Sequence, residues 1–324
     1  MSNNLLITGA KGQLGCELRE LLSIRGIAEH MGWKIFYTDI EELDITDRDA
    51  VNIFIRNNKI DVVINCAAYT AVDKAEDEHE SCFRINGDAP RYLSEALIKK
   101  SVGRGSNGRC IPFIIHISTD YVFDGLSSIP YNEESPANPV TVYGKSKLAG
   151  EKGIIESGAN YVIIRTSWLY SKYGKNFVET ILKLSAEKEE LNVVHDQWGA
   201  PTNAADLADA IIKIITFYLN TETKTGAANS SLSAIYHYSN EGICSWYQFA
   251  AEIVRLSERE CRVNPVTTNE FPTKAKRPAY SVMDKSKIKY FYEIDIPDWH
   301  DSLAKYLAIR HEFRQEATPN QTDV

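Results

Sequence analysis

The chain has 324 residues, 44% hydrophobic and 25% charged, an ordinary globular composition that excludes a disordered or low-complexity chain. Lysine and arginine total 36 against 44 aspartate and glutamate, a formal net charge of −8 that argues against nucleic acid as a partner. No apolar stretch is long enough to span a bilayer, and the N-terminal segment has no signal-peptide features. The six cysteines form no CxxC pair and the seven histidines show no metal-ligand spacing. We therefore expect a cytoplasmic protein with free thiols, no metal site and no membrane partner.

Short apolar segments alternate with longer amphipathic ones through the first half of the chain. The apolar segments are rich in Ile, Val, Phe and Tyr and predict strands buried on both faces, at residues 4–8, 34–38, 61–66, 113–118 and 161–165. The amphipathic segments predict helices at residues 13–23, 47–57, 86–100 and 141–157. This alternation predicts an α/β fold with a Rossmann-type, doubly wound parallel sheet.

The pattern is looser after Arg165. Helices are expected at residues 176–186 and 204–218, and a strand at 235–239. Prolines interrupt residues 264–298 too often for long regular elements, which suits a smaller lobe that closes over a ligand. The Gly/Ser-rich stretch 101–109 is interpreted as a solvated connection between a helix and a strand, with a basic contact site as the alternative.

Three glycines, Gly9, Gly12 and Gly15, follow the first predicted strand in a GxxGxxG pattern. Glycine permits a tight turn and lets backbone N–H groups approach a pyrophosphate at the positive end of the next helix. The pattern predicts a dinucleotide-binding loop, with a plain glycine-rich turn as the alternative.

Asp39 ends the second predicted strand, where a carboxylate can bind both ribose hydroxyls of NAD and repel the 2′-phosphate of NADP. We therefore expect a preference for NADH, with NADPH also accepted. The alternative for Asp39 is an ordinary turn residue.

Tyr143 and Lys147 form a YxxxK motif in the first turns of the helix expected at 141–157, where residues four apart share a face. Thr119 follows the strand expected at 113–118, at the edge where an open α/β sheet binds its ligand. The three groups fit the reduction of a ketone by a nicotinamide cofactor. Tyr143 is the expected acid, Lys147 lowers its pKa and binds the ribose, and Thr119 bonds the carbonyl oxygen. An ordinary surface tyrosine and lysine are the alternative.

Further segments complete a wider pattern. They are NCAAYTAVDKAE at 65–76, STDYVFDG at 118–125, YGKSKLAGE at 143–151, RTSWLY at 165–170 and DQWGAPT at 196–202. With the glycine loop and Arg277-Pro278 they cover most of the chain, and together they resemble the dTDP-4-dehydrorhamnose reductases of the extended short-chain dehydrogenase/reductase superfamily. The resemblance implies NAD(P)H-dependent reduction of the C4 ketone of dTDP-4-dehydro-L-rhamnose to dTDP-L-rhamnose. The implied partner is a dTDP-4-dehydro-6-deoxy-L-sugar.

The resemblance also implies the site residues and the domains. Cofactor contacts are implied for Gly12, Gln13, Leu14, Asp39, Asp44, Ile45, Ala67, Ala68 and Tyr69, and sugar contacts for Thr119, Asp120, Tyr121 and Trp168. Arg277 would bind a phosphate of the nucleotide. An equally weighted alternative is that Lys276 and Arg277 are solvated surface charges. The NAD(P)-binding domain would comprise residues 1–168 and about 192–234, and the substrate lobe 169–191 and about 235–324.

One departure from the family concerns metal. Some members form a Mg²⁺-linked dimer through glutamates, one of which matches Glu17, but this chain has Ala205 where another would stand. We therefore expect no magnesium, and leave monomer and homodimer open. Glu17 is expected to be an exposed residue in the first turn of its helix.

Two other functions share this fold. One is a nucleotide-sugar dehydratase or epimerase, and the other is a catalytically silent protein similar to the regulatory subunit of methionine adenosyltransferase. Dehydratases have Thr-Asp-Glu where this chain has Thr119-Asp120-Tyr121, so the base that abstracts the C5 proton is missing. Intact Thr119, Tyr143 and Lys147 argue against a silent protein.

Overall fold

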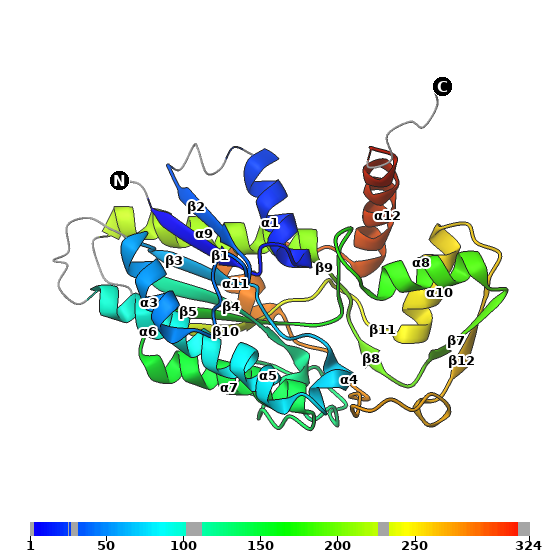
Figure 1. The fold of residues 1–324 in the computed structure, drawn as a ribbon. Coiled ribbons are helices and arrows are strands. Elements are labelled where there is room, and N and C mark those ends of the chain that lie inside the picture. Colours follow the sequence, from blue (N-terminus) through cyan, green and yellow to red (C-terminus); the bar gives the residue numbers. More distant parts are fainter. Residues whose placement is uncertain (1–2, 25, 27–31, 102–111, 226–232, 317–324) are drawn as a thin grey trace.

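The computed structural model describes residues 3–24, 26, 32–101, 112–225 and 233–316. Its centre is a six-stranded, wholly parallel sheet in the order β2-β1-β3-β4-β5-β10 (Figure 1). The strands are β1 (Asn4–Thr8), β2 (Lys34–Thr38), β3 (Val62–Asn65), β4 (Phe113–Thr119), β5 (Asn160–Thr166) and β10 (Ala234–His237). The parallel α/β prediction is confirmed, and the strands lie close to their expected bounds.

Helices cover both faces of this sheet. One face packs on α1 (Gln13–Ile24), α9 (Ala204–Thr225) and α11 (Ser286–Tyr292), and the other on α3 (Arg48–Asn57), α6 (Ala89–Ser101) and α7 (Val142–Ser157). Within β1, Leu5 and Ile7 enter the first core and Leu6 the second. Alternate residues face opposite layers, which is why each strand reads as a continuous apolar run.

Helix α7 packs closely against two neighbouring segments of the main chain. It begins after Thr141, whose hydroxyl accepts a hydrogen bond from the Gly144 backbone N–H, and ends at Gly158 with φ of 77°. A Cβ at Gly144 would stand 2.2 Å from the Tyr121 carbonyl oxygen, and one at Gly150 would stand 2.1 Å from that of Asn86. Glycine therefore lets the helix approach the segment that follows β4 at Gly144 and the turn that contains Asn86 at Gly150.

The helix expected at 86–100 begins earlier and is interrupted. The chain forms α5 (His79–Phe83), a π-helical turn (Arg84–Asp88) and then α6. Pro90 has no N–H to donate to Asn86, four residues earlier, so an α-helical bond is missing there. The buried Asn86 side chain accepts a hydrogen bond from the Tyr69 backbone N–H at 2.8 Å and donates one to the Tyr69 carbonyl at 3.0 Å.

The remaining elements build a smaller lobe beside the sheet (Figure 1). Its core joins α8 (Phe177–Glu187), α10 (Trp246–Leu256) and α12 (Trp299–Glu316). Short pairs of strands complete it: β7 (Glu190–Val194) with β12 (Arg262–Val266), β8 (Trp198–Gly199) with β11 (Cys244–Ser245), and β6 (Leu169–Tyr170) with β9 (Thr202–Asn203). Short helical turns also occur at α4 (Val72–Ala75), Asp120–Val122 and Thr268–Glu270.

The lobe contains less of the C-terminal part of the chain than was expected. Residues 235–324 were assigned to it, yet β10 pairs with β5 and α11 packs on the main sheet, because the edge of β5 and the apolar face beneath it need cover. The expected boundary between residues 191 and 192 falls inside β7.

Two sequence predictions can be compared only in part with this structure. The 101–109 stretch lies, apart from Ser101, outside the described residues. In the part that is described, no helix is long and apolar enough to cross a membrane.

Candidate functional site

A cleft of about 930 Å³ opens at the carboxyl ends of the sheet strands, between the sheet and the lobe. Every predicted site residue lines it except Tyr69. The Tyr69 hydroxyl donates to Glu78 at 2.7 Å, and its backbone is held by Asn86. Tyr69 therefore shapes the cofactor-lining loop through its main chain.

The glycine loop forms a cradle for a pyrophosphate. A Cβ at Gly9, where φ is 65°, would stand 2.6 Å from the Ala67 nitrogen, and one at Gly15 would stand 2.3 Å from the Gly9 oxygen. A Cβ at Gly12 would have a single close neighbour, the Gly9 oxygen at 3.2 Å, so a side chain at this position would extend into the open cleft. The loop also leads into the N-terminus of α1, which favours negative charge. These residues fit a dinucleotide.

The adenosine end of the cradle contains a cation that the sequence analysis missed. Asp39 accepts hydrogen bonds from the backbone N–H groups of Lys11, at 3.1 Å, and Ile40, at 2.9 Å. The Lys11 ammonium lies 2.8 Å from a Glu41 oxygen and 3.4 Å from one of Glu42. Sequence spacing hides this proximity, because it arises from the parallel pairing of β1 with β2.

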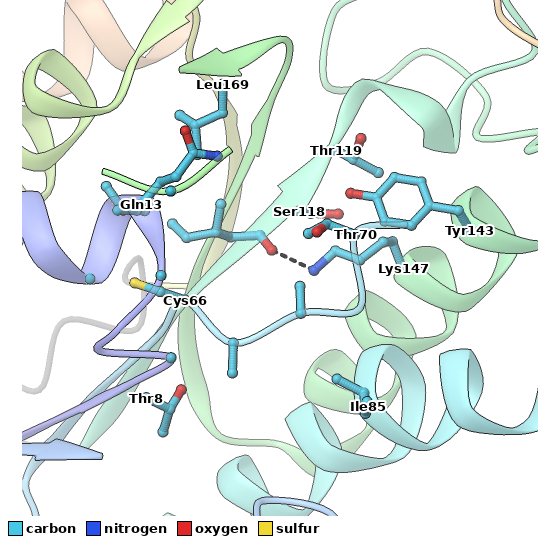
Figure 2. Close-up of a pocket in the computed structure, with 18 of the residues that line it drawn as sticks. Thr8, Gln13, Cys66, Thr70, Ile85, Ser118, Thr119, Tyr143, Lys147 and Leu169 are labelled. Atoms are coloured by element: carbon cyan, nitrogen blue, oxygen red, sulfur yellow. Dashed lines mark hydrogen bonds between the residues drawn. The ribbon is translucent and has the colours of Figure 1, made fainter. Parts of the chain in front are cut away.

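The three predicted catalytic groups meet at one end of the cleft. Thr119 ends β4, while Tyr143 and Lys147 occupy successive turns of α7. Figure 2 shows the Tyr143 hydroxyl pointing toward Thr119 and the Lys147 amine pointing to a backbone oxygen, that of Ile117, at 2.6 Å.

Burial dominates the electrostatics of this pair. It raises the pKa of Tyr143, against a hydrogen bond with Thr119 that lowers it. It lowers the pKa of Lys147 to about 8, against the attraction of Glu151. The expected lowering of the Tyr143 pKa by Lys147 stays a prediction.

A buried ion pair fixes α7 against the sheet. Arg165 on β5 donates to both carboxylate oxygens of Glu151 on α7, at 3.0 and 2.7 Å, and Ser118 donates to Glu151 at 2.5 Å. The two charged side chains are 4% and 1% exposed. This network ties the helix that carries Tyr143 to the strand that carries Thr119.

Asp120 brings a carboxyl group with spare bonding capacity into the cleft. One of its oxygens accepts from the Thr119 hydroxyl at 2.9 Å. The other is buried without a well-formed hydrogen bond, although the Ser281 hydroxyl is near enough to lower the pKa of the carboxyl. Burial raises the pKa of Asp120 to about 6. The free oxygen suits a ligand hydroxyl, because a buried acceptor without a partner is unfavourable.

Two aromatic side chains line the lobe side of the cleft. Trp168, with φ of 49°, stacks on Trp246 with ring centroids 3.6 Å apart. Trp246 lines the cleft as well, and no sequence motif predicted it. The pair presents a flat apolar surface to a ligand.

Arg277 extends from the lobe into the cleft. Its guanidinium donates to the Tyr121 hydroxyl at 3.1 Å and pairs with Asp73 at 2.5 Å. Its neighbour Lys276 is exposed, so the two adjacent cations differ. Of the two sequence interpretations, the structure favours the one that places Arg277 in the site.

Glu17 contradicts its prediction, because it is buried rather than exposed. The Ser171 hydroxyl donates to it at 2.6 Å, and burial raises its pKa. The reason is tertiary: the chain after β6 covers this turn of α1, which sequence position alone does not reveal. Among the described residues, no group of three or more His, Cys, Asp or Glu side chains could hold a metal ion.

A family model described as the RmlD substrate binding domain matches residues 3–311. The chain belongs to the RmlD family. The resemblance inferred from the sequence motifs is thereby confirmed.

Full-length relatives agree with this assignment. The chain is 40% identical over 306 residues to a dTDP-4-dehydrorhamnose reductase of Aggregatibacter actinomycetemcomitans, covering 92% of this chain and 96% of that one. It is also 40% identical over 306 residues to the spore coat polysaccharide biosynthesis protein SpsK of Bacillus subtilis, covering 94% and 97%. A solved structure of the dTDP-4-dehydrorhamnose reductase of Bacillus anthracis, in complex with NADP, superposes with a TM-score of 0.83 at 36% identity, covering 95% of this chain and all of the other.

The RmlD family is one of NAD(P)-dependent oxidoreductases that reduce dTDP-sugars, and it includes the reductases of dTDP-rhamnose biosynthesis. This chain, as a member, is a dTDP-sugar reductase with an NAD(P) cofactor.

Proposed function

We propose that this RmlD-family protein reduces the C4 ketone of dTDP-4-dehydro-L-rhamnose to give dTDP-L-rhamnose. The observation that carries the proposal is the meeting of Thr119, Tyr143 and Lys147 where the dinucleotide cradle adjoins the lobe. A bound NAD(P)H supplies the hydride. The chain itself must orient the ketone and deliver one proton.

Thr119 and Tyr143 perform these two tasks. Their hydroxyls face the same part of the cleft, so together they can bond one carbonyl oxygen (Figure 2). Tyr143 gives its proton to the alkoxide as it forms. Lys147 binds the cofactor ribose and stabilises the resulting tyrosinate by its positive charge.

The other lining residues select the nucleotide sugar. The unpartnered oxygen of Asp120 accepts from a sugar hydroxyl, and Trp168 packs against the 6-deoxy sugar. Arg277 exchanges Asp73 for a phosphate of the substrate, because a planar guanidinium can form two parallel charge-assisted hydrogen bonds with a phosphate. Tyr121 replaces the base of the dehydratases, so elimination of water is not expected.

Asp39 supports a preference for NADH, while Lys11 beside it supports acceptance of NADPH. The NADP complex of the Bacillus anthracis relative is consistent with that acceptance. A cytoplasmic location, as monomer or homodimer and without magnesium, remains part of this proposal.

Turnover tests the proposal directly. Purified protein given dTDP-4-dehydro-L-rhamnose should consume NADH stoichiometrically and form dTDP-L-rhamnose. With dTDP-glucose it should neither release water nor recycle its cofactor, and dehydration would refute the proposal in favour of the dehydratase. Inertness toward both sugars while NADH still binds would favour the silent regulatory protein. Reduction of a different dTDP-4-keto sugar alone would retain the family activity but refute the named substrate.

A further inference from the structure

A row of polar side chains crosses the otherwise apolar face of the sheet beneath Lys147. Thr8, Asn65 and His116 lie on the adjacent strands β1, β3 and β4 and are partners in strand register. They are fully buried, and the residues two positions earlier on the same strands belong to an apolar core. Polar groups in such a place are unfavourable unless they are hydrogen-bonded.

The row is hydrogen-bonded throughout and ends on the ammonium of Lys147. Thr8 Oγ1 lies 2.7 Å from Asn65 Oδ1, and the Asn65 amide lies 3.1 Å from His116 Nδ1. His116 Nε2 lies 3.3 Å from Lys147 Nζ. The row therefore connects the strand before the glycine loop to the lysine expected to bind the ribose.

The protonation of His116 follows from its two partners. An ammonium can only donate, so Nε2 must accept and the single proton of the neutral ring must lie on Nδ1. This assignment requires the Asn65 amide to be turned over, so that its oxygen and its NH₂ group exchange places. The oxygen then accepts from Nδ1–H, and the NH₂ group donates to the Thr8 hydroxyl. The ring is neutral, because burial and the charge of Lys147 hold the pKa of His116 well below its ordinary value.

We propose that His116 is a positioning residue for Lys147, which it holds by accepting a hydrogen bond from the ammonium at Nε2. Of the three donors of the ammonium, one is bound by His116 and one by the Ile117 carbonyl, both on β4. The third remains for the cleft, which Lys147 lines. The inference rests on the role of Lys147 in the proposed function.

A neutral acceptor also favours the charged form of a lysine that burial would discharge. The titratable groups that act on Lys147 are Glu151 on α7, His116 on β4, Cys66 after β3 and Cys82 on α5, with Arg165 on β5 bound to Glu151. Tyr143 lies one helical turn before Lys147 on α7. Within the described residues, the ammonium forms hydrogen bonds with His116 Nε2 and with the Ile117 carbonyl oxygen. Loss of the His116 acceptor should therefore discharge Lys147 at a lower pH.

Two substitutions of similar size separate positioning from packing. His116→Leu removes the acceptor, whereas His116→Gln places an amide oxygen near the position of Nε2. The full-length proteins are compared by kcat, by KM for NADH and by NADH affinity, each between pH 6 and 9.5. Thermal unfolding measures any loss of stability separately.

The pH profiles of kcat and of NADH affinity should each fall on their alkaline side, here called the alkaline limb, as Lys147 loses its proton. In His116→Leu this limb should move to lower pH by about one unit. Activity at pH 6 should stay within about threefold of wild type, and at pH 8.5 it should fall about tenfold. His116→Gln should restore the wild-type profile. Equal losses at every pH in both variants, with the limb unmoved, would reduce His116 to a packing residue and overturn the proposal.

A limb that moves upward in His116→Leu would mean that Nε2 donates to a neutral lysine, which also overturns it. If that variant does not fold, Asn65→Leu tests the same assignment. It leaves Nδ1–H without an acceptor, so the limb should again move down, and an unmoved or raised limb contradicts the proposal. If the wild type reduced no dTDP-sugar, the proposed function would fail, yet the pH profile of NADH affinity would still decide the role of His116.

Discussion

The charged groups in the cleft and next to it are held in two different ways. On the sheet side lie Asp120, Lys147, Glu151 and Arg165, here called the floor, whose side chains are buried. On the open side lie Lys11, Asp39, Asp73 and Arg277, here called the rim. The ion pair of the rim, Arg277 with Asp73, is 22% and 45% exposed, against 4% and 1% for Arg165 and Glu151 in the floor.

The difference separates two kinds of contribution. A buried pair cannot exchange its partner for water, so breaking it leaves an uncompensated charge. A half-exposed pair contributes little to folding, so a ligand group can replace one partner at low cost. Floor substitutions should therefore change catalysis and stability, while rim substitutions should change affinity and specificity.

The largest effect is expected at Tyr143, which stands over the floor. Tyr143→Phe keeps the ring and its edge contact with Tyr121 but removes the proton donor. We expect kcat to fall by about 10²–10⁴-fold with NADH affinity nearly unchanged. Stopped-flow NADH oxidation measures this, and a loss below about threefold would exclude Tyr143 as the acid.

Breaking the ion pair of the floor should destabilise the protein most. Glu151→Ala leaves the buried Arg165 guanidinium without its carboxylate partner, so the free energy of unfolding should fall by about 3–5 kcal/mol. Urea denaturation tests this, with Glu156→Ala, an exposed position on the same helix, as the control. Similar small losses in the two variants would show that the pair is not held as described.

Asp120 should act in the opposite direction, because its carboxyl is buried without full compensation. Its pKa is raised from 3.8 to about 6, so the ionised group opposes folding above about pH 6 and has little effect below about pH 4. Asp120→Asn should therefore raise the free energy of unfolding by up to about 3 kcal/mol at pH 8 and by little at pH 4.

Denaturation at the two pH values measures the difference. Asp124→Asn is the control of opposite sign, because the backbone N–H of Leu126 and the Tyr131 hydroxyl lower the pKa of Asp124. That variant should lose stability at pH 8. A gain at Asp120 that is equal at both pH values would contradict the assignment to ionisation.

At the rim, Arg277→Ala should raise KM for the nucleotide sugar by about 10–100-fold through the lost charged hydrogen bonds, with kcat within about threefold. Stability should change by less than about 1 kcal/mol. Lys276→Ala, at the exposed neighbour, is the control. Steady-state kinetics decide, and a fall in kcat with constant KM would place Arg277 with the floor.

The smallest effect is expected for cofactor choice. Asp39→Ala removes a carboxylate that would face a 2′-phosphate, so the ratio of kcat/KM for NADPH to that for NADH should rise about tenfold. Lys11→Ala should shift the same ratio downward, because it removes the ammonium, paired with Glu41, from the end of the cleft that Asp39 lines. An unchanged ratio in both variants would mean that the ribose is recognised elsewhere.

Local sequence signals predicted residues of both the floor and the rim. Strands such as β1 and β4 were predictable because burial on both faces makes them continuously apolar. Thr119, Tyr143 and Lys147 were predictable because strand ends and helix spacing fix where they project. Asp39 and Arg277 came from the end of a predicted strand and from a family motif.

Other features depend on contacts between distant segments and carried no such signal. Trp246 lies in the cleft against Trp168 and Phe177, and Glu17 is buried beneath the chain that contains Ser171. His116 reads as one more residue of a buried strand until Lys147 is placed beside it. The helix α12 and the return of β10 to the sheet were likewise missed, since local periodicity does not say which layer an element joins.

The position of β10 in the chain has a consequence for biosynthesis. Residues 234–237 complete the sheet, so the ribosome must make α8, β7 and α9 before β5 gains its second neighbour. Until then the main-chain groups along the outer edge of β5 stay available to another nascent chain. A polypeptide that terminates early, after α9, would keep that edge permanently open. Such fragments should self-associate rather than accumulate as a free nucleotide-binding half.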